Sequence, residues 1–286
     1  MSPCADHDPF PRVASSARVA ANREIAPGVF ELVCDRALPG SSGRIPAPVP
    51  GQFFMLRARP SGVLLGRPIS VYRSGDDSIT FLILRKGAGS AELCGLRAGD
   101  ALDLVGPIGN RFVPPAELCV GGLPGFTERA MRVALVGGGI GVAPIAGFSF
   151  GLAAKSFDFY ASYRSAPYGL DGIEARAPKL VVTTEDGSAG VKGMLPAVFD
   201  AGAYDLVYAC GPTPMLRYVQ KACADARAAS GHAASDTAAS PIAFLSLEEH
   251  MACGAGACLG CTVRTTGGNR RCCVDGPVFN GAEVIL

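Results

Sequence analysis

Short apolar or alternating segments, separated by glycine and proline turns, make up the first third of the chain. This pattern predicts strands over residues 18–20, 29–34, 52–57, 69–72, 78–84 and 101–105, and one short helix over residues 89–95. Several short strands joined by tight turns are typical of an antiparallel barrel. We therefore expect a β-barrel as the first domain, over residues 13–122.

From about residue 123 the pattern changes to apolar strands that alternate with helical segments. Strands are predicted over residues 131–136, 157–163, 180–184 and 205–209, and a helix of small residues follows the glycine-rich turn after the first of them. This alternation is typical of a parallel sheet, which binds ligands at the carboxyl ends of its strands. The second predicted domain is an α/β domain with a parallel sheet, over residues 123–240.

The end of the chain follows a third pattern. Residues 224–240 are rich in alanine and serine and lack apolar periodicity, which predicts the end of a helix and a mobile linker. Beyond it we expect a strand over residues 242–247, and strands over 261–265 and 284–286 that pair with each other. A small third module over residues 241–286 completes a multi-domain α+β fold.

The composition excludes some classes of function. The 286 residues are 49% hydrophobic and 18% charged with a formal net charge of +1, so neither a nucleic-acid-binding surface nor an acidic tail is indicated. Residues 1–12 lack the apolar core of a signal peptide. Residues 133–154 are uncharged and long enough to span a bilayer, but their glycines and Pro144 favour a strand, a turn and a buried helix. We expect no membrane association and a cytoplasmic location, which keeps cysteines reduced.

Five of the 11 cysteines lie within 21 residues near the C-terminus. Cys253, Cys258 and Cys261 have the C-x₄-C-x₂-C spacing of plant-type [2Fe–2S] ferredoxins, and the adjacent Cys272 and Cys273 follow after a short interval. The loop between the first three is rich in glycine. Small residues let such a loop wrap a cluster and direct backbone N–H groups at the sulfurs, so an iron–sulfur cluster is the favoured interpretation.

Zinc, disulfide bonds and inert thiols account less well for these cysteines. A structural zinc site usually uses two short C-x₂₋₄-C pairs, whereas the second pair here is adjacent; zinc stays open as an alternative. Disulfides are disfavoured because nothing marks the chain as secreted, and inert buried thiols would not concentrate in one loop. A Rieske centre needs two histidine ligands, and His7, His232 and His250 show no matching spacing.

Two segments of the first domain combine cations with turn residues. Arg67, Pro68, Ile69 and Ser70 begin a predicted strand, where a guanidinium and a hydroxyl could grip a phosphate and a polar ring edge. Residues 85–90, Arg-Lys-Gly-Ala-Gly-Ser, follow another strand, where backbone N–H groups could cradle a pyrophosphate. Ordinary turn chemistry explains each segment taken alone.

Together they resemble the flavin-binding barrel of the ferredoxin-reductase superfamily, in which an Arg-Pro-x-Ser segment and a later glycine-rich loop hold the flavin. This resemblance implies that FAD is bound by Arg67, Pro68, Ile69, Ser70, Leu84, Arg85, Lys86, Gly89 and Ser90.

In the second domain, a glycine-rich turn after the first strand suits a dinucleotide. Glycines let the backbone approach a diphosphate, and the following helix supplies unpaired N–H groups. The turn departs from the full Rossmann fingerprint, since Pro144 stands where the third glycine would be. The same superfamily pairs such a turn with a Cys-Gly-Pro turn to bind NAD(P)H, which implies Gly138, Gly139, Ile140, Gly141, Pro144, Cys210, Gly211 and Pro212.

The choice between NAD and NADP depends on a weaker signal. Glu185 and Asp186 follow the third strand of this domain, where carboxylates would accept from ribose hydroxyls and repel a 2′-phosphate. This favours NAD. An ordinary polar turn explains the same residues.

The order of barrel, nucleotide domain and cysteine module is similar to that of the electron-transfer subunits of NAD-dependent (class 1B) dihydroorotate dehydrogenase. The resemblance rests on residues 67–70, 137–144, 208–215, 246–261 and 273–279, and extends from Ile25 to the C-terminus. It implies that the cluster ligands are Cys253, Cys258, Cys261 and Cys273, with Cys272 as a spare. The departures are a proline-rich insertion over residues 44–50, the alanine/serine linker and the short interval before Cys273.

The family resemblance also implies a function. An FMN-containing partner subunit oxidises dihydroorotate, and electrons reach NAD⁺ through a [2Fe–2S] cluster and FAD in this chain, as part of pyrimidine biosynthesis and in a heterotetramer of two copies of each subunit. No residue of this chain is expected to act as acid or base, and Cys210 either adjoins the flavin–nicotinamide contact or serves in packing.

Two alternative functions stay open. One is another NAD(P)H-dependent flavin/iron–sulfur reductase, serving an oxygenase or a sulfide or ferredoxin oxidoreductase. The other is a non-catalytic redox or zinc-sensing module.

Overall fold

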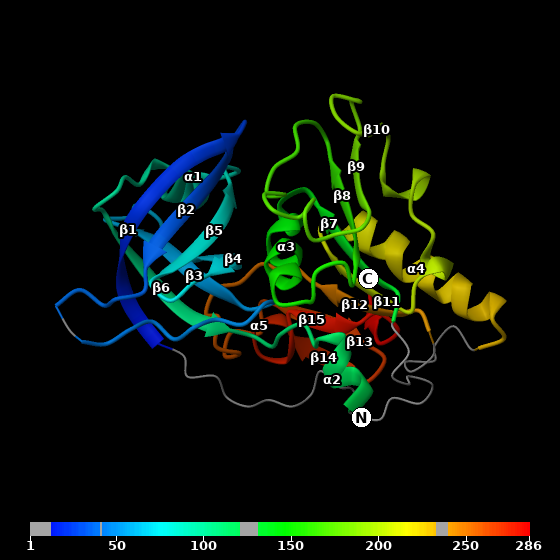
Figure 1. The fold of residues 1–286 in the computed structure, drawn as a ribbon. Coiled ribbons are helices and arrows are strands. Elements are labelled where there is room, and N and C mark those ends of the chain that lie inside the picture. Colours follow the sequence, from blue (N-terminus) through cyan, green and yellow to red (C-terminus); the bar gives the residue numbers. More distant parts are fainter. Residues whose placement is uncertain (1–12, 41, 121–130, 233–239) are drawn as a thin grey trace.

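The computed structural model describes residues 13–40, 42–120, 131–232 and 240–286. The polar N-terminal segment, the boundary expected at residues 122–123 and residues 233–239 of the alanine/serine linker lie outside these ranges. Within them the predicted multi-domain α+β fold is confirmed: a barrel stands beside a mainly parallel sheet, and a small cysteine-bearing module lies beneath both in the view of Figure 1.

The first domain is a closed barrel of six antiparallel strands in the order β1-β2-β5-β4-β3-β6 (Figure 1). The strands are β1 (Val13–Ala26), β2 (Val29–Asp35), β3 (Phe53–Arg59), β4 (Arg67–Ser74), β5 (Ser78–Leu84) and β6 (Ala101–Ile108), and the short helix α1 (Ala88–Gly95) follows β5. Inward-facing apolar residues fill the barrel, with Phe54 and Phe81 in edge-to-face contact at 5.8 Å between ring centroids. All six predicted strands are present.

The first strand is much longer than the predicted residues 18–20. Its first half pairs with β6 and its second half with β2, with a register shift between Val19 and Ala21. Polar residues such as Ser15, Asn22 and Arg23 occupy this strand, so its apolar pattern is visible only near the middle. A long bent strand that serves two neighbours in a barrel does not need a continuous apolar stripe.

The second domain contains a seven-stranded sheet in the order β10-β9-β8-β7-β11-β12-β15. Its strands are β7 (Val133–Gly138), β8 (Asp158–Tyr163), β9 (Leu180–Thr184), β10 (Val191–Lys192), β11 (Leu206–Cys210), β12 (Ile242–Ser246) and β15 (Val278–Asn280). All neighbours are parallel except β12 and β15, which are antiparallel. The helix α2 (Pro115–Val120) belongs to the connection from the barrel.

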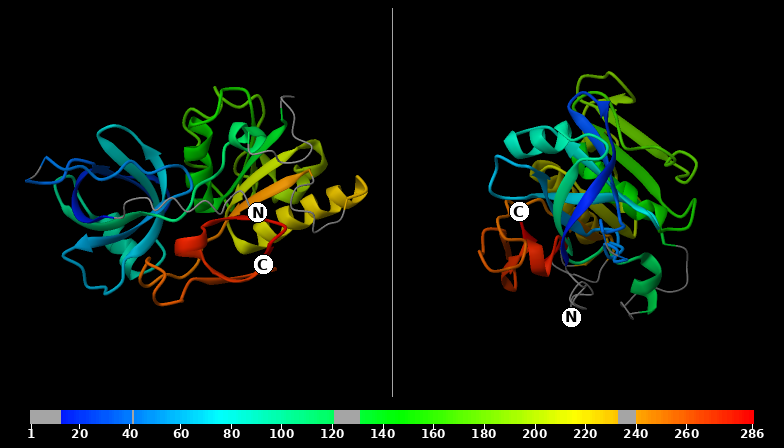
Figure 2. Two further views of the ribbon diagram at one scale, coloured as in Figure 1. Left: turned by 90° about the horizontal axis from the view of Figure 1, so that it is seen from below. Right: turned by 90° about the vertical axis from the view of Figure 1, so that its left-hand side faces the viewer.

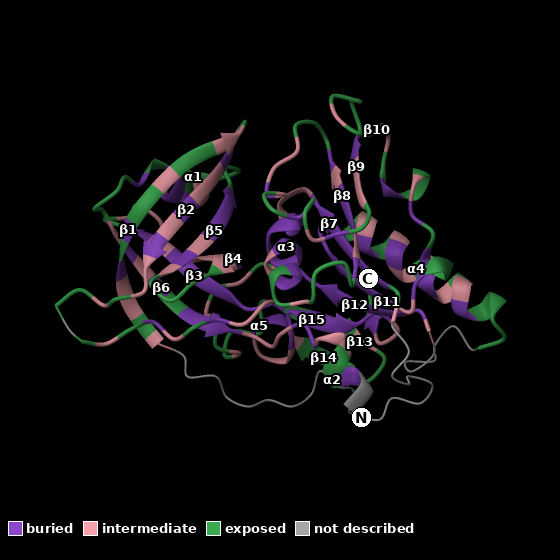
Figure 3. Cartoon of the chain, in the orientation of Figure 1, coloured by how far each residue is buried: buried purple, intermediate pink, exposed green. Residues whose placement is uncertain are grey.

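Two helices cover opposite faces of this sheet. The helix α3 (Val142–Phe150) packs with Leu135 on one face, and α4 (Thr213–Ala229) packs with Val136 on the other. The short turns η1 (Gly139–Gly141), η2 (Leu195–Ala197) and η3 (Ala201–Ala203) complete the domain. The central strands β7, β11 and β12 are buried along their length (Figure 3). Burial on both faces explains why their sequences are continuous apolar runs rather than alternating ones.

The C-terminal module is continuous with that sheet. Its own three-stranded sheet has the order β14 (Gly268–Arg271), β13 (Thr262–Thr265) and β16 (Val284–Ile285), and α5 (Cys272–Asp275) follows β14. The predicted pairing of residues 261–265 with 284–286 is confirmed, with Arg264 opposite Ile285. However, β12 and β15, which the sequence division places in the third module, are strands of the nucleotide sheet. The left view of Figure 2 shows the red C-terminal segment beside the golden strand β12.

The uncharged residues 133–154 form β7, η1 and α3, as the glycine pattern predicted. Among the helices that the structure describes, none is both long and apolar enough to cross a membrane.

The barrel and the nucleotide domain meet where α3 packs on β4. Gly147 lies so close to β4 that a Cβ on it would be 2.5 Å from the Tyr72 carbonyl oxygen. Beside this contact, Arg73 donates a hydrogen bond to the Asp171 carbonyl at 2.6 Å and stacks over the Phe150 ring at 4.7 Å. The relative position of the two domains therefore depends on direct contact between a helix and a strand backbone.

We expect Gly147→Ala to lower the free energy of unfolding by about 1–3 kcal/mol, because the added methyl group must displace β4 from α3. Alanine would otherwise stabilise a helix by up to about 1 kcal/mol relative to glycine. The matched control is Gly95→Ala in α1, where a Cβ would meet nothing within 4 Å. Thermal unfolding of the two variants measures the difference, and equal midpoints would contradict the proposed close contact.

Candidate functional site

The first predicted flavin segment forms the beginning of β4. Residues Arg67 and Ser70 lie opposite Leu56 and Phe53 of β3, so the segment is held in a regular antiparallel pair. The Arg67 guanidinium crosses to α1 and lies against the Gly89 backbone, where any Cβ would overlap it. The structure therefore brings together the two flavin segments that the sequence predicted separately.

The second flavin segment is the turn that opens α1. The Ser90 hydroxyl accepts hydrogen bonds from the backbone N–H groups of Lys86, at 2.9 Å, and Gly87, at 3.0 Å. Ser90 therefore stabilises the conformation of the turn through these hydrogen bonds, a role that the sequence prediction did not include. The N–H groups in the first turn of α1 have no helical partner, so they can meet an anion. Arg85 lies over the Phe30 ring at 5.6 Å, and Leu84 is exposed at the strand end.

The two predicted nucleotide turns are in direct contact. The strands β7 and β11 are adjacent and parallel, with Gly137 opposite Cys210, so both turns leave the sheet at the same edge. A Cβ on Gly141 would lie 2.5 Å from the Cys210 carbonyl oxygen, and one on Gly138 would lie 3.0 Å from the Pro212 ring. Glycine is required at Gly141, where the obstructing atom belongs to the backbone, and Gly139 has a left-handed φ of +53°, which favours glycine.

The remaining predicted nucleotide residues lie close by. Ile140 is in the short turn between β7 and α3, and Pro144 is in the first turn of α3, where a missing N–H has no cost. Gly211 follows β11 and packs on Gly138. The structure thus gathers all of the predicted nucleotide residues at one edge of the sheet.

Glu248 interacts electrostatically with Lys86 of a flavin segment and with Cys210 of a nucleotide turn, and the sequence prediction did not include it. It lies two positions after Ser246, the last residue of β12, which is opposite Cys210 in the sheet. Glu248 is exposed, yet the protein around it raises the pKa of its carboxyl, and the positive charge of Lys86 opposes this shift. A carboxylate directly after the strand predicted over residues 242–247 was the available signal.

Two neighbours of Glu248 are kept neutral. Burial raises the pKa of the Tyr168 hydroxyl to about 12, and the charge of Glu248 adds to the shift. Burial likewise raises the pKa of the Cys210 thiol well above its usual range, again with a contribution from Glu248. Cys210 is therefore a neutral buried thiol, which suits packing beside the nucleotide turn and not proton transfer.

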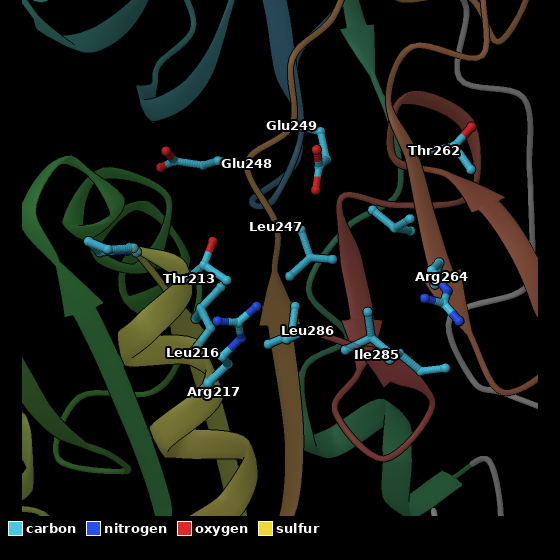
Figure 4. A pocket seen from close by; sticks show the side chains of 14 residues that line it. Thr213, Leu216, Arg217, Leu247, Glu248, Glu249, Thr262, Arg264, Ile285 and Leu286 are labelled. Atoms are coloured by element: carbon cyan, nitrogen blue, oxygen red, sulfur yellow. The ribbon is translucent and has the colours of Figure 1, made fainter.

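A cavity of about 370 Å³ lies behind the Cys-Gly-Pro turn, between α4 and β13 (Figure 4). Arg217 of α4 and Arg264 of β13 line it, and Glu248 and Glu249 stand at the end near β12. The lining carries both signs of charge, so the cavity favours neither an anion nor a cation.

The first pair of predicted cluster ligands is held by backbone N–H groups. Those of Ala255 and Cys258 point at the Cys253 sulfur, at 3.3 and 3.4 Å, and lower the pKa of this thiol to about 6. The Gly260 N–H points at the Cys258 sulfur at 3.5 Å. A loop that directs backbone N–H donors at sulfur fits thiolate ligands.

The second pair consists of Cys261 and Cys273, which are both buried. Burial raises the pKa of the Cys273 thiol to about 12, and a hydrogen bond with the Cys261 thiol adds to the shift. Cys272 is also buried, but its sulfur lies 3.5 Å from the Leu247 carbonyl oxygen and donates to it. The geometry therefore separates Cys273, which lies with the predicted ligands, from Cys272.

The four predicted ligands fall into two pairs, Cys253 with Cys258 and Cys261 with Cys273. A [2Fe–2S] cluster takes two protein ligands at each iron, whereas a structural zinc ion takes four around one centre. The pairing of Cys253 with Cys258 and of Cys261 with Cys273 fits the two-iron group.

Comparison with known proteins agrees with this geometry. The family model described as the iron–sulfur cluster binding domain of dihydroorotate dehydrogenase B matches residues 248–285. The dihydroorotate dehydrogenase B (NAD(+)) electron transfer subunit of Clostridium acetobutylicum is 40% identical over 237 residues, which cover 83% of this chain and 86% of that protein. The subunit of the same name from Clostridium perfringens is 34% identical over 271 residues, covering 93% and 96%.

Solved structures show the same architecture. The NADH-dependent reduced ferredoxin-NADP oxidoreductase, reported in a study of flavin-based electron bifurcation, superimposes with a TM-score of 0.69 at 25% identity and covers 94% of this chain and 89% of its own. The ferredoxin reductase of carbazole 1,9a-dioxygenase has a TM-score of 0.57 at 22% identity, covering 74% and 65%, and shows the fold alone.

We expect Cys273→Ser to lose the iron–sulfur cluster and Cys272→Ser to keep it, because Cys273 hydrogen-bonds with the predicted ligand Cys261 whereas Cys272 donates to the Leu247 carbonyl. Iron and acid-labile sulfide per chain, measured on protein purified without oxygen, provide the test. The two variants differ by one position and are both buried, so general destabilisation affects both. An equal fall in iron content would show that the choice of ligand is wrong.

Proposed function

The chain belongs to the family of dihydroorotate dehydrogenase B electron transfer subunits, and we propose that it transfers electrons between a catalytic dihydroorotate dehydrogenase subunit and NAD⁺. The observation that carries this proposal is the convergence of three sites. The stretch from β12 to α5 contains the paired cysteines, lies beside the nucleotide turn after β11, and packs through Gly254 on Met55, which is opposite Pro68 of the flavin strand.

Each predicted group has a set of residues that fits it. FAD is held by the start of β4 and the turn before α1, NAD by the two glycine turns, and the [2Fe–2S] cluster by the two sulfur pairs. The proposed ligands are Arg67, Pro68, Ile69, Ser70, Leu84, Arg85, Lys86, Gly89 and Ser90 for FAD; Gly138, Gly139, Ile140, Gly141, Pro144, Cys210, Gly211 and Pro212 for NAD; and Cys253, Cys258, Cys261 and Cys273 for the cluster.

The overall reaction balances across the two subunits. Dihydroorotate loses two electrons and two protons at the partner, NAD⁺ gains two electrons and one proton as a hydride, and the other proton goes to solvent. When bound, the cluster supplies one-electron transfer and FAD supplies the link between single electrons and hydride. The residues of this chain bind, orient and shield these groups.

Several side chains have roles that follow from their positions. Arg67 places a positive charge at the N-terminus of α1, where a flavin diphosphate is expected. Glycines at the β7 and β11 turns leave room for a nucleotide backbone. Cys210, buried and neutral, packs beneath them. No described residue in this group needs to exchange a proton with substrate for the proposed chemistry.

The preference for NAD over NADP is proposed from the carboxylates after β9. Glu185 is exposed at the carboxyl end of that strand. Asp186 accepts a hydrogen bond from the Ser188 N–H at 2.9 Å, and its contacts with Ser188 lower the pKa of its carboxyl. The carboxylate of Asp186 disfavours a 2′-phosphate there.

The partner in this proposal is an FMN-containing catalytic subunit, in a cytoplasmic heterotetramer of two copies of each chain. Support comes from the names of the relatives, which describe an electron transfer subunit and so require a second chain. Co-purification with an FMN-containing dehydrogenase subunit distinguishes this partner from the oxygenase that a reductase of the same fold would serve.

An anaerobic visible spectrum of the purified chain, before and after addition of NADH, tests the proposed cofactors. We expect flavin bands with a broad iron–sulfur shoulder, and we expect both to bleach with NADH. Bleaching of a flavin spectrum without the shoulder would indicate a reductase that lacks a cluster. A colourless protein that contains zinc would favour the regulatory module instead.

We expect Arg67→Ala to weaken FAD retention by about tenfold to a hundredfold, since hydrogen bonds to a charged group contribute about 1.5–3 kcal/mol. FAD per chain after gel filtration, and the dissociation constant from flavin titration, measure the effect. Arg18→Ala is the matched control, because Arg18 is an exposed arginine of the same barrel that lies on β1. Unchanged flavin occupancy in Arg67→Ala would contradict the assignment of the barrel.

A further inference from the structure

The end of the barrel is hydrogen-bonded to the cysteine module through Asn110. This residue follows β6 by two positions, and its backbone N–H donates to the Gly276 carbonyl at 2.6 Å. Its side-chain amide donates to the carbonyls of Val278, at 2.8 Å, and Asp275, at 3.2 Å. Its side-chain oxygen accepts from the Val278 N–H at 3.0 Å. Four hydrogen bonds thus join segments about 165 residues apart in the sequence.

The Asn110 side chain takes the place of a strand at the edge of the sheet. On one side, β15 pairs with β12, with Val278 opposite Ser246. On the other side, both backbone groups of Val278 bond to the same amide of Asn110. A side-chain amide has the same donor and acceptor as a peptide group, so it satisfies this edge as another strand would.

Close packing accompanies the hydrogen bonds. Gly109 has φ +84°, and a Cβ on it would lie 2.6 Å from the Pro277 ring and 2.7 Å from the Gly276 carbonyl oxygen. Near the first sulfur pair, a Cβ on Gly254 would lie 2.9 Å from the Met55 side chain. The cysteine module is therefore seated directly on the backbone and core of the barrel.

These contacts adjoin both the proposed cluster ligands and the proposed flavin strand. Gly254 is next to Cys253 in the chain, and Asp275 ends the four-residue helix that contains Cys273. On the barrel side, Met55 of β3 lies opposite Pro68 of β4. The contact between the barrel and the cysteine module thus lies between the residues proposed to hold the cluster and those proposed to hold FAD.

We propose that Asn110 is a positioning residue that sets the separation between the cluster and the flavin. This inference rests on the proposed function. In the step concerned, one electron leaves the flavin and one arrives at the cluster, or the reverse, and no atom is transferred. The rate of such a step depends on the separation of the two groups, and Asn110 fixes it by holding the α5–β15 segment on the barrel.

The experiment uses Asn110→Ala in the purified holoprotein. Stopped-flow absorbance after mixing with NADH follows the bleaching of the flavin and then of the cluster. We expect flavin bleaching at the rate of the unmodified protein and cluster bleaching slowed by about tenfold or more, because small displacements of reacting groups have large effects on rate. Hydrogen–deuterium exchange of the peptide that contains Val278 is expected to accelerate in the variant, whatever the redox activity.

Gln220→Ala is the matched control. The Gln220 amide donates to the Gly281 and Val284 carbonyls at 2.6 and 2.7 Å, so it holds the same module from the nucleotide domain rather than from the barrel. We expect a similar loss of thermal stability with an unchanged rate of cluster bleaching. Asn110→Asp keeps the acceptor for Val278 but turns a carboxylate toward two carbonyl oxygens, and it should slow cluster bleaching as the alanine variant does.

Three results would overturn the inference. The first is cluster bleaching at the normal rate in Asn110→Ala, and the second is cluster bleaching slowed to the same extent in Gln220→Ala. The third is loss of iron from the Asn110 variants, which would show that Asn110 is needed to hold the cluster. If Asn110→Ala does not fold, Asn110→Gln, which retains both donors one carbon further out, is expected to slow cluster bleaching, and a normal rate in that variant would be equally decisive. Failure of NADH to bleach the flavin of the unmodified protein would count against the proposed function instead, and the exchange measurement would still test the contact.

Discussion

Direct backbone contact between two glycine turns is the constraint on which the arrangement of this protein depends. A Cβ on Gly141 would lie 2.5 Å from the Cys210 carbonyl oxygen, and a Cβ on Gly211 would lie 2.9 Å from the Gly138 Cα, so neither position has room for a side chain. The two turns end adjacent parallel strands, so their contact determines where every segment at that edge of the sheet lies. A larger residue at either glycine would move the end of a strand, because backbone cannot yield as a flexible side chain does.

The same kind of contact recurs wherever two parts of the chain meet. Gly147 brings α3 onto β4, Gly89 admits the Arg67 guanidinium, and Gly254 seats the cysteine loop on the barrel. Of these contacts, that of Gly147 is with backbone, which cannot shift by a change of rotamer. Groups that exchange electrons need a constant separation, and such a contact helps to provide it.

The sequence was sufficient where periodicity and local chemistry agree. The continuous apolar runs of the sheet and the short runs of the barrel placed nearly every strand. A strand buried on both faces has a continuous apolar sequence, and a strand buried on one face alternates apolar and polar residues. It was insufficient where a residue acts through a distant partner. The role of Ser90 in its own turn, the position of Glu248 beside Lys86 and the hydrogen bonds of Asn110 have no local signature. The full length of β1 was missed because its polar residues obscure the apolar pattern.

The sequence by itself therefore determined the order of the three parts, the classes of strand and turn, and the residue types that suit a flavin, a dinucleotide and an iron–sulfur cluster. Each of these depends on neighbours within a few positions. The tertiary structure alone decided that β12 and β15 extend the nucleotide sheet, that Cys273 and Cys261 form a pair while Cys272 turns to Leu247, and that the barrel carries the module directly. Those outcomes depend on packing between segments that are far apart in the chain. Whether two such segments fit against each other depends on the whole fold, and the sequence of a few neighbouring residues does not determine it.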